Sequence, residues 1–420
     1  MFDISLRKVK IKFILYLILL TVSTIFLSCS GSKRYGETQF PKSIKKTKTN
    51  NLINVLLQEN LSTFTYLVKQ EISISNGYKQ LAIVKSGNQI SFKINDGAII
   101  ASIGRSYMES EVFVLSELSK SPVLFNDKKY RGEIILLSNR DRLQIVNSVD
   151  LEDYLKGVLP VEMGVKGKQE YFESLKAFAI AARTFALMKM SKSNNFFDIY
   201  PDVRDQVYGG YNVETQLDNC AVEETKGEYL SYSNEYATIL YHSTCGGVTE
   251  DVGNVFSATN IPYLISQKDG DDNCKISPSF NWTETYSNQK IIEFLLNARL
   301  INDNSLSVSS ININERFPSG RIKKILINLS DDTLVEIGYR QIRSLFRRND
   351  NNGILRSTNF IISTELTEDR IVSFTLTGKG NGHGVGLCQW GSMALSSKGW
   401  NYRKILEFYF PATSIRKINA

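Results

Sequence analysis

The sequence predicts an α+β protein, in which a β-rich core contains one central helix of small residues and follows a small N-terminal β module. Short segments of alternating apolar and polar residues recur between Gly, Asn and Asp, which is typical of strands and hairpins. One segment of about twenty residues repeats its apolar positions at spacings of three and four, the period of a helix with a buried face. With 420 residues and 42% hydrophobic content, the chain can form two or three packed domains.

The N-terminus predicts export. Four basic residues between positions 7 and 12 precede FILYLILLTVSTIFL, an apolar run of 15 residues. The run is shorter than the roughly 20 residues of a membrane-spanning helix and matches the core of a signal peptide. Cys29 follows in FLSCSGS, which resembles a lipobox, so we expect a lipoprotein signal over 1–28 and lipidation of Cys29. An uncleaved signal anchor and an ordinary cleaved signal are the alternatives.

The charge distribution argues against a nucleic-acid partner. The formal net charge is +7, but residues 1–50 carry ten Lys or Arg and only two Asp or Glu. The remaining chain has 40 basic and 41 acidic residues and is nearly neutral. A polyanion-binding surface therefore has no support in the body of the protein.

The chain divides into three predicted parts after the signal. Residues 29–61 are rich in Lys, Ser, Thr and Asn without periodicity and are expected to form a tether. Residues 62–122 are expected to form the small β module, with strand segments such as QLAIVKSG and QISFKIND. The main domain is expected over 123–415.

Within the main domain, the clearest predicted helix is 169–190, QEYFESLKAFAIAARTFALMKM. Its five alanines leave little bulk, so neighbouring backbone can approach closely. Shorter helices are expected near 288–299, 338–346, 389–398 and 402–409. Strands are expected in GEYLSYS, EYATILYHST, RIKKILINLS and NFIISTEL.

Glu162 is the first candidate for chemistry. It lies in VLPVEMGVKG between a proline-containing apolar stretch and the predicted long helix. A carboxyl group with apolar neighbours resists ionisation because desolvation disfavours its charged form. Such a group can act as a general acid near neutral pH. The alternative is a structural glutamate that caps the helix or pairs with Lys166.

A second candidate lies in TGKGNGHGVGLCQWG, where glycine occupies every second position from 378 to 386. We expect an extended segment with one bare face, which a ligand or another backbone can approach closely. The spacing does not match a phosphate-binding loop. His383 is the one titratable group on the other face and is a candidate site residue, the alternative being a structural histidine.

Four cysteines follow the signal region: Cys220, Cys245, Cys274 and Cys388. His242 lies three residues before Cys245. His242, Cys245 and Cys274 could supply three ligands of a tetrahedral zinc site. Because an exported protein can retain disulfides, a Cys245–Cys274 disulfide or free thiols are the favoured alternative. Cys388 is most simply a small buried residue.

Many separate segments, in order, resemble the SpoIID/LytB domain family over roughly 123–415. They are YRGEIILLSNRDRLQIVNSVDLEDYLKGVLPVEM, ESLKAFAIAARTFAL, DQVYGG, YHSTCGGVTEDVGNVF, PYLISQKDGDDNC, SPSFNW, SGRIKKILI, ILRSTNF and GKGNGHGVGLCQWGSMALSSKGWNYRKILEFYF. The family pattern is often Pro-Ser-Glu-Met where this chain has Pro-Val-Glu-Met, a departure that keeps the acid. The resemblance says nothing of residues 62–122.

The resemblance implies a protein that acts on peptidoglycan glycan strands in the cell wall or periplasm. Sporulation members of the family are lytic transglycosylases, and LytB-like members are described as amidase enhancers, so an N-acetylmuramoyl-L-alanine amidase is an implied partner. The catalytic glutamate of the sporulation members falls on Glu162. A lytic transglycosylase uses the 6-hydroxyl of muramic acid as nucleophile and forms a 1,6-anhydro product, so one acid suffices.

The other predicted site residues follow from that reading. His242, Ser243 and Thr244 are expected to form a second wall of a sugar-binding cleft, and His383 with Gln389 a third. Arg183 is expected to pair with or orient a site carboxylate. Tyr208 is one of several aromatic residues beside the motifs that suit sugar faces, with burial in the core as the alternative.

Three alternatives to a lytic transglycosylase stay open from the sequence. An ordinary glycosidase needs two carboxylates, and the fold could bring Asp153 close to Glu162. A non-catalytic wall-binding module could stimulate an amidase through the same cleft. A zinc hydrolase could be built on His242, Cys245 and Cys274. The family resemblance also implies that a zinc ion could bind near the cleft, and no other cofactor is expected.

Overall fold

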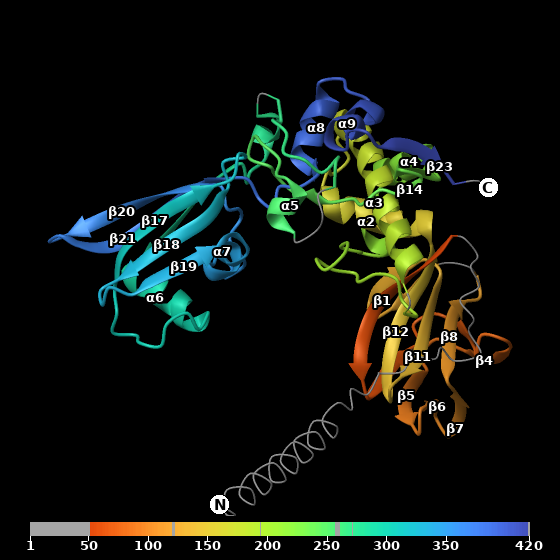
Figure 1. Ribbon diagram of the computed structural model, residues 1–420. Coiled ribbons are helices and arrows are strands. Elements are labelled where there is room, and N and C mark those ends of the chain that lie inside the picture. Colours follow the sequence, from red (N-terminus) through yellow and green to blue (C-terminus); the bar gives the residue numbers. More distant parts are fainter. Residues whose placement is uncertain (1–50, 120–121, 194, 257–260, 271, 419–420) are drawn as a thin grey trace, which may run out of the picture. The chain divides into compact units, whose positions relative to one another are not determined.

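The computed structural model describes residues 51–119, 122–193, 195–256, 261–270 and 272–418. Helices and strands are mixed along the chain (Figure 1), which confirms the predicted mixed class. In these residues the strands form several small and mostly antiparallel sheets. The expected signal over 1–28 and the lipidated Cys29 lie outside the described residues. No helix in the described part of the chain is both long and apolar enough to cross a membrane.

Strands from residues 52–150 form a six-stranded sheet, in which the first of them, β1, pairs with the last, β12. Its strand order is β1-β12-β11-β8-β3-β4. The bounds of its strands are β1 Leu52–Leu61, β3 Ile72–Ser75, β4 Gln80–Val84, β8 Val112–Glu117, β11 Glu133–Asn139 and β12 Arg142–Asp150. β1 pairs antiparallel with β12 from Leu52 opposite Asp150 to Leu61 opposite Leu143. The expected tether over 29–61 therefore does not extend to residue 61, because its last ten residues form a sheet strand.

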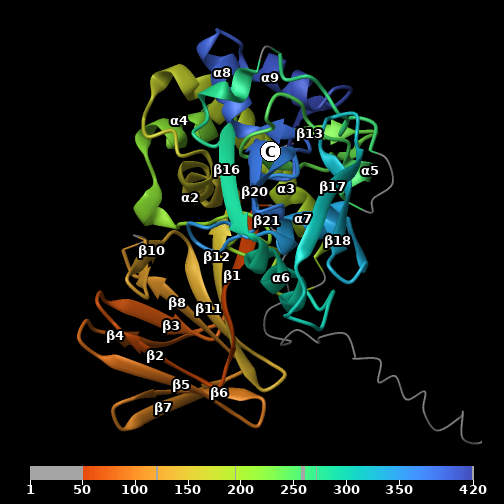
Figure 2. The ribbon, with the colours of Figure 1, turned by 90° about the vertical axis from the view of Figure 1, so that its left-hand side faces the viewer.

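A four-stranded sheet packs against the first one (Figure 2). Its order is β2-β5-β6-β7, with bounds β2 Thr63–Leu67, β5 Gln89–Asn95, β6 Ala98–Ile103 and β7 Ser106–Ser110. Phe92 of β5 and Phe113 of β8 meet between the two sheets with ring centroids 5.9 Å apart. A short hairpin, β9 Val123–Phe125 with β10 Lys128–Tyr130, adds Phe125 to the same core.

The predicted boundary near 122 does not separate two folding units. Strands β11 and β12 belong to the expected main domain, yet they complete the sheet formed by β1, β3, β4 and β8. One hydrophobic cluster includes Ile53 and Phe92 from the sheets and Phe178 and Leu406 from the helices. The β module is thus continuous with the domain that follows it.

Helix α2, Leu151–Met163, begins directly after β12. Asp150 caps it by accepting from the N–H of Glu152, and two acidic residues lie in its first turn, where they stabilise the helix dipole. The helix ends at Gly164, whose left-handed conformation (φ 59°) lets its N–H donate to the carbonyl of Pro160 at 3.1 Å.

Helix α3, Phe172–Lys192, follows a 3₁₀ turn at Gln169–Tyr171 and agrees with the helix expected over 169–190. Its alanines are fully buried, and it packs against α2, α4, α8, α9 and β13. The bounds of those neighbours are α4 Gln216–Glu224, α8 Gln389–Ser397, α9 Tyr402–Tyr409 and β13 Glu228–Tyr232. Its expected place in the centre of a single β-rich core stays a prediction.

Short strands connect distant parts of the chain around these helices. β13 pairs with β14 (Glu235–Tyr236) and with β23 (Ser414–Lys417). β15 (Tyr241–His242) pairs in parallel with β22 (Leu387–Cys388), which places His242 opposite Cys388. Helix α5 (Val252–Val255) and 3₁₀ turns at Tyr211–Val213 and Asn273–Ile276 lie in the intervening loops.

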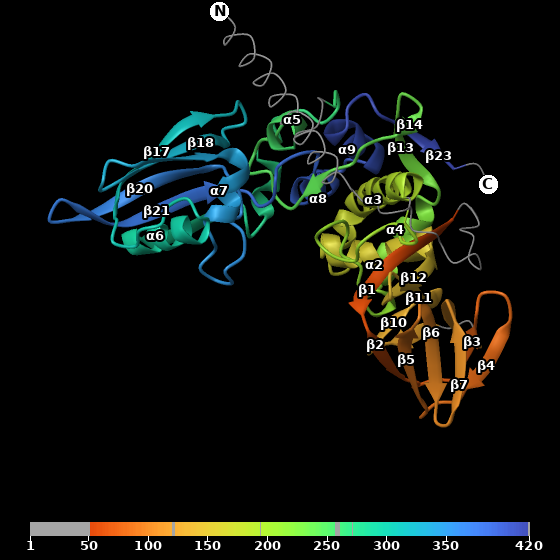
Figure 3. The same ribbon diagram turned by 60° about the horizontal axis from the view of Figure 1, so that its bottom comes forward.

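Residues 281–379 have a hydrophobic cluster of their own. Two three-stranded sheets carry it, with orders β16-β21-β20 and β17-β18-β19, and α6 and α7 lie beside these strands (Figure 3). The bounds are β16 Asn281–Ser287, α6 Asn288–Asn297, β17 Val308–Arg316, β18 Ile322–Leu329, β19 Leu334–Gly338, α7 Tyr339–Leu345, β20 Phe360–Thr367 and β21 Arg370–Lys379. The four shorter helices predicted from the sequence agree with α6, α7, α8 and α9.

Candidate functional site

Glu162 lies in the last turn of α2 and is half-buried. Its neighbour Val161 is 39% exposed and Gly164 is exposed, so this end of the helix reaches solvent. The alternative in which Glu162 caps the long helix is not what the structure contains, because α3 begins ten residues later and Glu162 accepts no bond from it. The carboxyl group is instead held by three other segments of the chain.

Three groups meet the Glu162 carboxyl. The backbone N–H of Val207 donates to Oε1 at 2.8 Å. Gln389 Nε2 donates to the backbone carbonyl of Glu162 at 3.1 Å and lies 3.5 Å from Oε2. The buried Tyr241 hydroxyl lies close enough to lower the pKa of the carboxyl, although the two are not aligned as a regular hydrogen bond. A backbone amide, a side-chain amide and a phenol thus surround one acid.

Burial raises the pKa of Glu162 above its ordinary value. The hydrogen bonds from Val207 and Gln389 and the nearby Tyr241 hydroxyl oppose this shift because they favour the charged form, but burial is the larger cause. The carboxyl therefore keeps its proton to a higher pH than an exposed glutamate would. This is the property that a general acid needs near neutral pH.

The two other acids of α2 do not join Glu162. Asp153 lies nine residues earlier on the same helix, about 13 Å along the axis, where Lys156 binds it at 3.0 Å. Glu152 accepts two bonds from Arg183, at 2.9 Å and 2.6 Å. Arg183 is completely buried and thus orients Glu152 at the start of α2, whereas the sequence pointed to a site carboxylate.

The two histidines bind the backbone of the same residue, Val385. The N–H of Val385 donates to Nδ1 of His383 at 3.1 Å, and Nδ1 of His242 binds the carbonyl of Val385, also at 3.1 Å. The ring centroids are 5.6 Å apart. Since a neutral imidazole has one donor and one acceptor, these bonds assign the proton to Nε2 in His383 and to Nδ1 in His242.

Both histidines are held neutral. Burial lowers the pKa of His242 well below its usual range, and it lowers that of His383 to about 4, with further contributions from the charges of Arg343 and Arg321. The Nε2 atom of His242 is buried and has no hydrogen-bond partner in the described residues. Neither ring can therefore serve as a proton donor near neutral pH.

Strand β15 places its two side chains on opposite sides, as adjacent strand residues do. Tyr241 faces α3, where its ring meets Phe178 at 4.8 Å, and its hydroxyl approaches Glu162. His242 faces His383 and Val385. Within the described chain, no hydrogen bond joins either imidazole to the Glu162 carboxyl, so the predicted histidine walls are not in direct contact with the acid.

Gly378 and Lys379 end strand β21, but residues 380–386 form a loop and not the extended strand that was expected. Gly380, Gly382, Gly384 and Gly386 all have positive φ values. Another backbone does approach closely, as predicted: a Cβ on Gly382 would lie 2.8 Å from the Cβ of His242, and one on Gly386 would collide with the carbonyl of Leu240. Gly380, Gly382 and Gly386 therefore admit residues 240–245 of the same chain, and Gly384 admits the Arg321 side chain.

Three further predicted residues have structural contacts. The Thr244 side chain is buried and hydrogen-bonds Ser277 at 2.7 Å, while the half-buried Ser243 lies 3.2 Å from Thr244. Tyr208 is 6% exposed, donates to Asn147 at 2.9 Å and packs on Tyr154. Its role is to hold the loop from which Val207 reaches Glu162. Of the predicted residues, Gln389 alone contacts the acid directly.

Three groups of this region were not predicted from the sequence: Val207 and Tyr241 beside Glu162, and Arg321 near the two histidines. Val207 acts through its backbone, which a side-chain pattern does not reveal, although DQVYGG was singled out as a motif. Tyr241 was only one of several aromatics beside the motifs. Arg321 is 1% exposed and donates to the carbonyls of Cys245 and Val248 at 2.6 Å and 2.9 Å. Its signal in the sequence was a basic residue within an otherwise strand-like segment.

Comparison with known proteins gives a family assignment. Residues 139–232 match the model of the SpoIID family, described as Stage II sporulation protein, and this range contains Glu162 and Val207. Stage II sporulation protein D of Bacillus subtilis is 27% identical over 298 residues, covering 66% of this chain and 77% of that protein. The amidase enhancer of the same species is 30% identical over 306 residues, covering 62% of this chain and 40% of its own length.

The chain belongs to the SpoIID/LytB family.

The similarity extends beyond the SpoIID match. Residues 223–386 match a second model, described only as a domain of unknown function, DUF8618, and this range contains Tyr241 and both histidines. An uncharacterized protein of Brachyspira hyodysenteriae is 29% identical over 388 residues, which cover 90% of this chain and 96% of that protein. Gln389 follows the end of both family matches, so the SpoIID/LytB site draws on three stretches of sequence.

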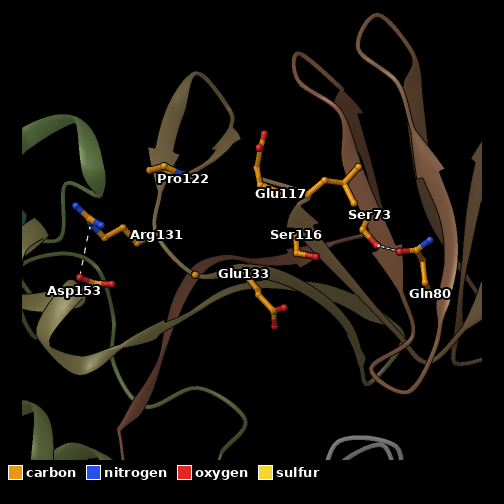
Figure 4. A pocket seen from close by; sticks show the side chains of 10 residues that line it. Ser73, Gln80, Ser116, Glu117, Pro122, Arg131, Glu133 and Asp153 are labelled. Atoms are coloured by element: carbon orange, nitrogen blue, oxygen red, sulfur yellow. Dashed lines mark hydrogen bonds and ion pairs between the residues drawn. The ribbon is translucent and has the colours of Figure 1, made fainter. Parts of the chain in front are cut away.

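A pocket of about 510 Å³ lies away from the acid (Figure 4). Its lining includes Ser73, Glu117, Arg131, Glu133 and Asp153 but not Glu162. Asp153 enters it from α2 and lies 3.8 Å from Arg131. Three acidic side chains, those of Glu117, Glu133 and Asp153, line this pocket, and Glu162 is not part of its lining.

The predicted zinc ligands are only partly brought together. Cys245 and Cys274 are free thiols with their Sγ atoms 3.4 Å apart, which is one of the two alternatives that the sequence favoured over zinc. His242 is not part of this group; Asp269 and Cys388 complete it instead. Asp269 and Cys388 lie 24 and 143 residues after Cys245, so the spacing of residues around Cys245 did not predict them as ligands.

Proposed function

We propose that this chain is a peptidoglycan lytic transglycosylase in which Glu162 acts as general acid and then as general base. The observation that supports this most is the environment of Glu162, a half-buried carboxyl whose pKa is raised by burial and whose hydrogen-bond donors hold it in one orientation. The similarity to an amidase enhancer supports a substrate in the cell envelope.

In the proposed reaction, the Glu162 carboxyl donates its proton to the glycosidic oxygen, and the bond from muramic acid C1 to that oxygen breaks. The 6-hydroxyl of the same muramic acid then forms a bond to C1, and its proton passes to the Glu162 carboxylate. The products are a 1,6-anhydro end and a free 4-hydroxyl, and the acid is regenerated. Val207 and Gln389 stabilise the carboxylate between the two proton transfers.

A single acid fits this chemistry better than ordinary hydrolysis. Hydrolases need a second carboxylate within roughly 5–9 Å of the acid. The groups that contact Glu162 are amides and a phenol, and the other acids of α2 are bound to Lys156 and Arg183. This argues for a nucleophile supplied by the substrate.

The test is incubation of the purified protein with peptide-free glycan strands, followed by mass spectrometry of the ends. We expect 1,6-anhydro-muramyl ends from the unmodified protein. Glu162→Gln should reduce their formation by about 100-fold or more, because the amide cannot donate a proton to the leaving oxygen. Binding of the strands should persist.

Glu170→Gln is the matched control, since Glu170 is an exposed glutamate shortly after α2. It should leave product formation unchanged. Hydrolysed reducing ends in place of anhydro ends would contradict the proposed chemistry. Strands that remain uncut at every protein concentration would contradict catalysis altogether.

The similarity to an amidase enhancer supports a second candidate, in which the chain binds glycan and stimulates an N-acetylmuramoyl-L-alanine amidase. The chain spans 40% of the length of that relative. Adding this protein to an amidase digest of whole sacculi distinguishes the two. Stimulation that is equal for the unmodified protein and Glu162→Gln supports the binding module.

A further inference from the structure

Four buried side chains converge at one point behind the glycine-rich loop. The Sγ atoms of Cys245, Cys274 and Cys388 and a carboxylate oxygen of Asp269 all lie within 4.8 Å of one another. Each of the four residues is 0% exposed. The Sγ atom of Cys245 lies 3.4 Å from that of Cys274 and 3.1 Å from Oδ2 of Asp269.

These distances suit a tetrahedral ion. Zinc binds thiolates at about 2.3 Å, which separates neighbouring ligands of a tetrahedron by about 3.8 Å. Three thiolates and one carboxylate are ligands that zinc takes in proteins. A disulfide between Cys245 and Cys274 would use only two of the four groups and would leave Cys388 and Asp269 facing it without a function.

The groups around the cluster orient its ligands. The N–H groups of Cys245 and Gly391 donate to Sγ of Cys388 at 3.2 Å and 3.3 Å. Tyr409 donates to Oδ1 of Asp269 at 2.8 Å, which leaves Oδ2 toward the thiols. Backbone donors to thiolates and a hydrogen bond on the distal carboxylate oxygen are the outer contacts that metal sites use.

We propose that Cys245, Asp269, Cys274 and Cys388 form a structural zinc site. All four positions of the tetrahedron are taken by protein, and none of the ligands is exposed, which is the arrangement of structural sites and not of catalytic ones. The site replaces the set of His242, Cys245 and Cys274 that the sequence suggested, and it removes the basis for a zinc hydrolase.

The zinc site stabilises the segments that complete the acid site. Cys388 immediately precedes Gln389, which contacts Glu162, and it is the residue opposite His242 in the β15–β22 pair. Cys245 follows the same strand by three residues. An ion bound to both cysteines therefore fixes the strands that carry Tyr241 and Gln389, without contact with the substrate.

The test is the zinc content of the full chain, purified without chelators and measured by inductively coupled plasma mass spectrometry. We expect one zinc per chain. Cys274→Ser and Cys388→Ser should lower the content at least about tenfold, because each removes a ligand. Cys220→Ser is the matched control and should retain the ion, since Cys220 is an exposed thiol outside the cluster.

A second measurement remains informative if the serine variants do not fold. Cobalt(II) exchanged into the unmodified protein should show the visible absorption of a tetrahedral site with sulfur ligands. Asp269→Cys should keep the ion and increase the sulfur-to-cobalt charge-transfer absorption by about a third, since it raises the thiolates from three to four.

Two results would overturn the zinc site. One is unmodified protein that contains no zinc and carries a Cys245–Cys274 disulfide in peptide mass spectra. The other is zinc content that Cys274→Ser and Cys388→Ser leave unchanged. Neither result bears on glycan cleavage, because metal content and anhydro ends are measured separately.

Discussion

At the scale of single residues, the state of Glu162 depends on a balance between burial and hydrogen bonding. Removal from water favours the protonated form, whereas Val207, Tyr241 and Gln389 favour the carboxylate. A carboxyl group that donates a proton and later accepts one needs both burial and hydrogen bonding. Burial alone would keep it protonated, and hydrogen bonding alone would keep it ionised. The two amide donors, Val207 and Gln389, also keep the carboxyl oxygens in place during the change.

Removing the Tyr241 hydroxyl should move the pH profile of cleavage. In the proposed mechanism, cleavage needs protonated Glu162, so the rate should fall as pH rises through the pKa of this group. Tyr241 lowers that pKa, and Tyr241→Phe should therefore shift the alkaline limb to higher pH. The ring contact with Phe178 is kept, so the plateau rate should change by no more than roughly fivefold, the value of one hydrogen bond.

The measurement is the initial rate of anhydro-end formation between pH 4 and 9. Gln389→Leu provides an independent comparison, because Gln389 also lowers the pKa of Glu162. It should shift the profile in the same direction. A shift to lower pH in both variants would show that Glu162 is not the titrating acid.

His383 should make the protein less stable in acid. Its pKa is about 4 in the fold and 6.5 as the ordinary value, so the unfolded chain binds the proton first as pH falls. Stability is unaffected above about pH 7 and decreases from there toward pH 4, by about 2 kcal/mol at pH 5. Denaturant unfolding at pH 7 and pH 5 measures this difference.

In His383→Asn, the side-chain oxygen can still accept from Val385, and the difference between the two pH values should shrink. His242 contributes in the same direction, since its pKa is also lowered. Some acid sensitivity therefore persists in the variant. An unchanged difference would mean that His383 is already exposed to solvent protons in the fold.

Sequence reasoning predicted the acid but not its surroundings. Apolar neighbours in VLPVEMGVKG indicated that Glu162 is removed from water, and the structure confirms the raised pKa. Arg183 and Tyr208 were assigned to the site because they lie in its motifs, yet both side chains are turned into the core. Membership of a motif fixes a residue's place along the chain and not the direction of its side chain.

At the scale of elements, the end of α2 determines where Glu162 lies. Gly164 ends the helix with φ 59°, and a Cβ there would have nothing within 4 Å. Gly164→Ala should therefore cost about 1–2 kcal/mol from the backbone alone. Because the last turn carries Glu162, cleavage should fall further than the loss of stability predicts.

Gly104→Ala is the matched control for this change. Gly104 has φ 58° and also has nothing within 4 Å of an added Cβ, but it lies in the turn between β6 and β7. The two variants should unfold at similar denaturant concentrations, with activity reduced only in Gly164→Ala. Equal activity in both would show that the helix end does not position the acid.

Elements with a strong period were predicted more accurately than those held by tertiary contacts. The spacing of apolar residues gave α3 to within about three residues, and α6 to α9 were similarly close. The alternate glycines of 378–386 have the period of a strand, but those at 380–386 have positive φ values and lie against residues 240–245 and Arg321. No local pattern contains that information.

At the scale of the whole molecule, β1 connects the N-terminal sheet to the acid site. Its Asn54 accepts from the N–H of Asp198 at 2.8 Å, and Leu56 donates to the carbonyl of Ile199 at 3.0 Å. The segment so held leads directly into the loop that contains Val207. The sequence did not predict this strand, because residues 52–61 were grouped with the polar residues before them into the tether predicted for 29–61.

Truncation should locate the true start of the fold. A chain that begins at residue 51 keeps β1 and should unfold as cooperatively as the full chain. A chain that begins at residue 62 loses Ile53, Val55 and Leu56, each no more than 3% exposed, and leaves an edge of β12 unpaired. Their burial contributes roughly 5 kcal/mol or more, comparable with the stability of a whole domain.

Circular dichroism during thermal unfolding compares the two truncations. We expect a sharp transition for the longer chain and no cooperative transition for the shorter one. If the shorter chain melted like the longer one, β1 would be an accessory strand. The predicted division at 122 fails for the same physical reason, since pairing partners in a sheet need not be neighbours in sequence.

The bond from Gln389 to Glu162 joins residues 227 positions apart. During translation the carboxyl group leaves the ribosome long before the amide that steadies it, and a chain stopped anywhere short of residue 389 has an unfinished acid. In the proposed function, a nascent or prematurely ended product lacks one of the donors that hold the acid and should not cleave glycan. Under that proposal, the order of synthesis alone delays cleavage until the chain has been extended past residue 389.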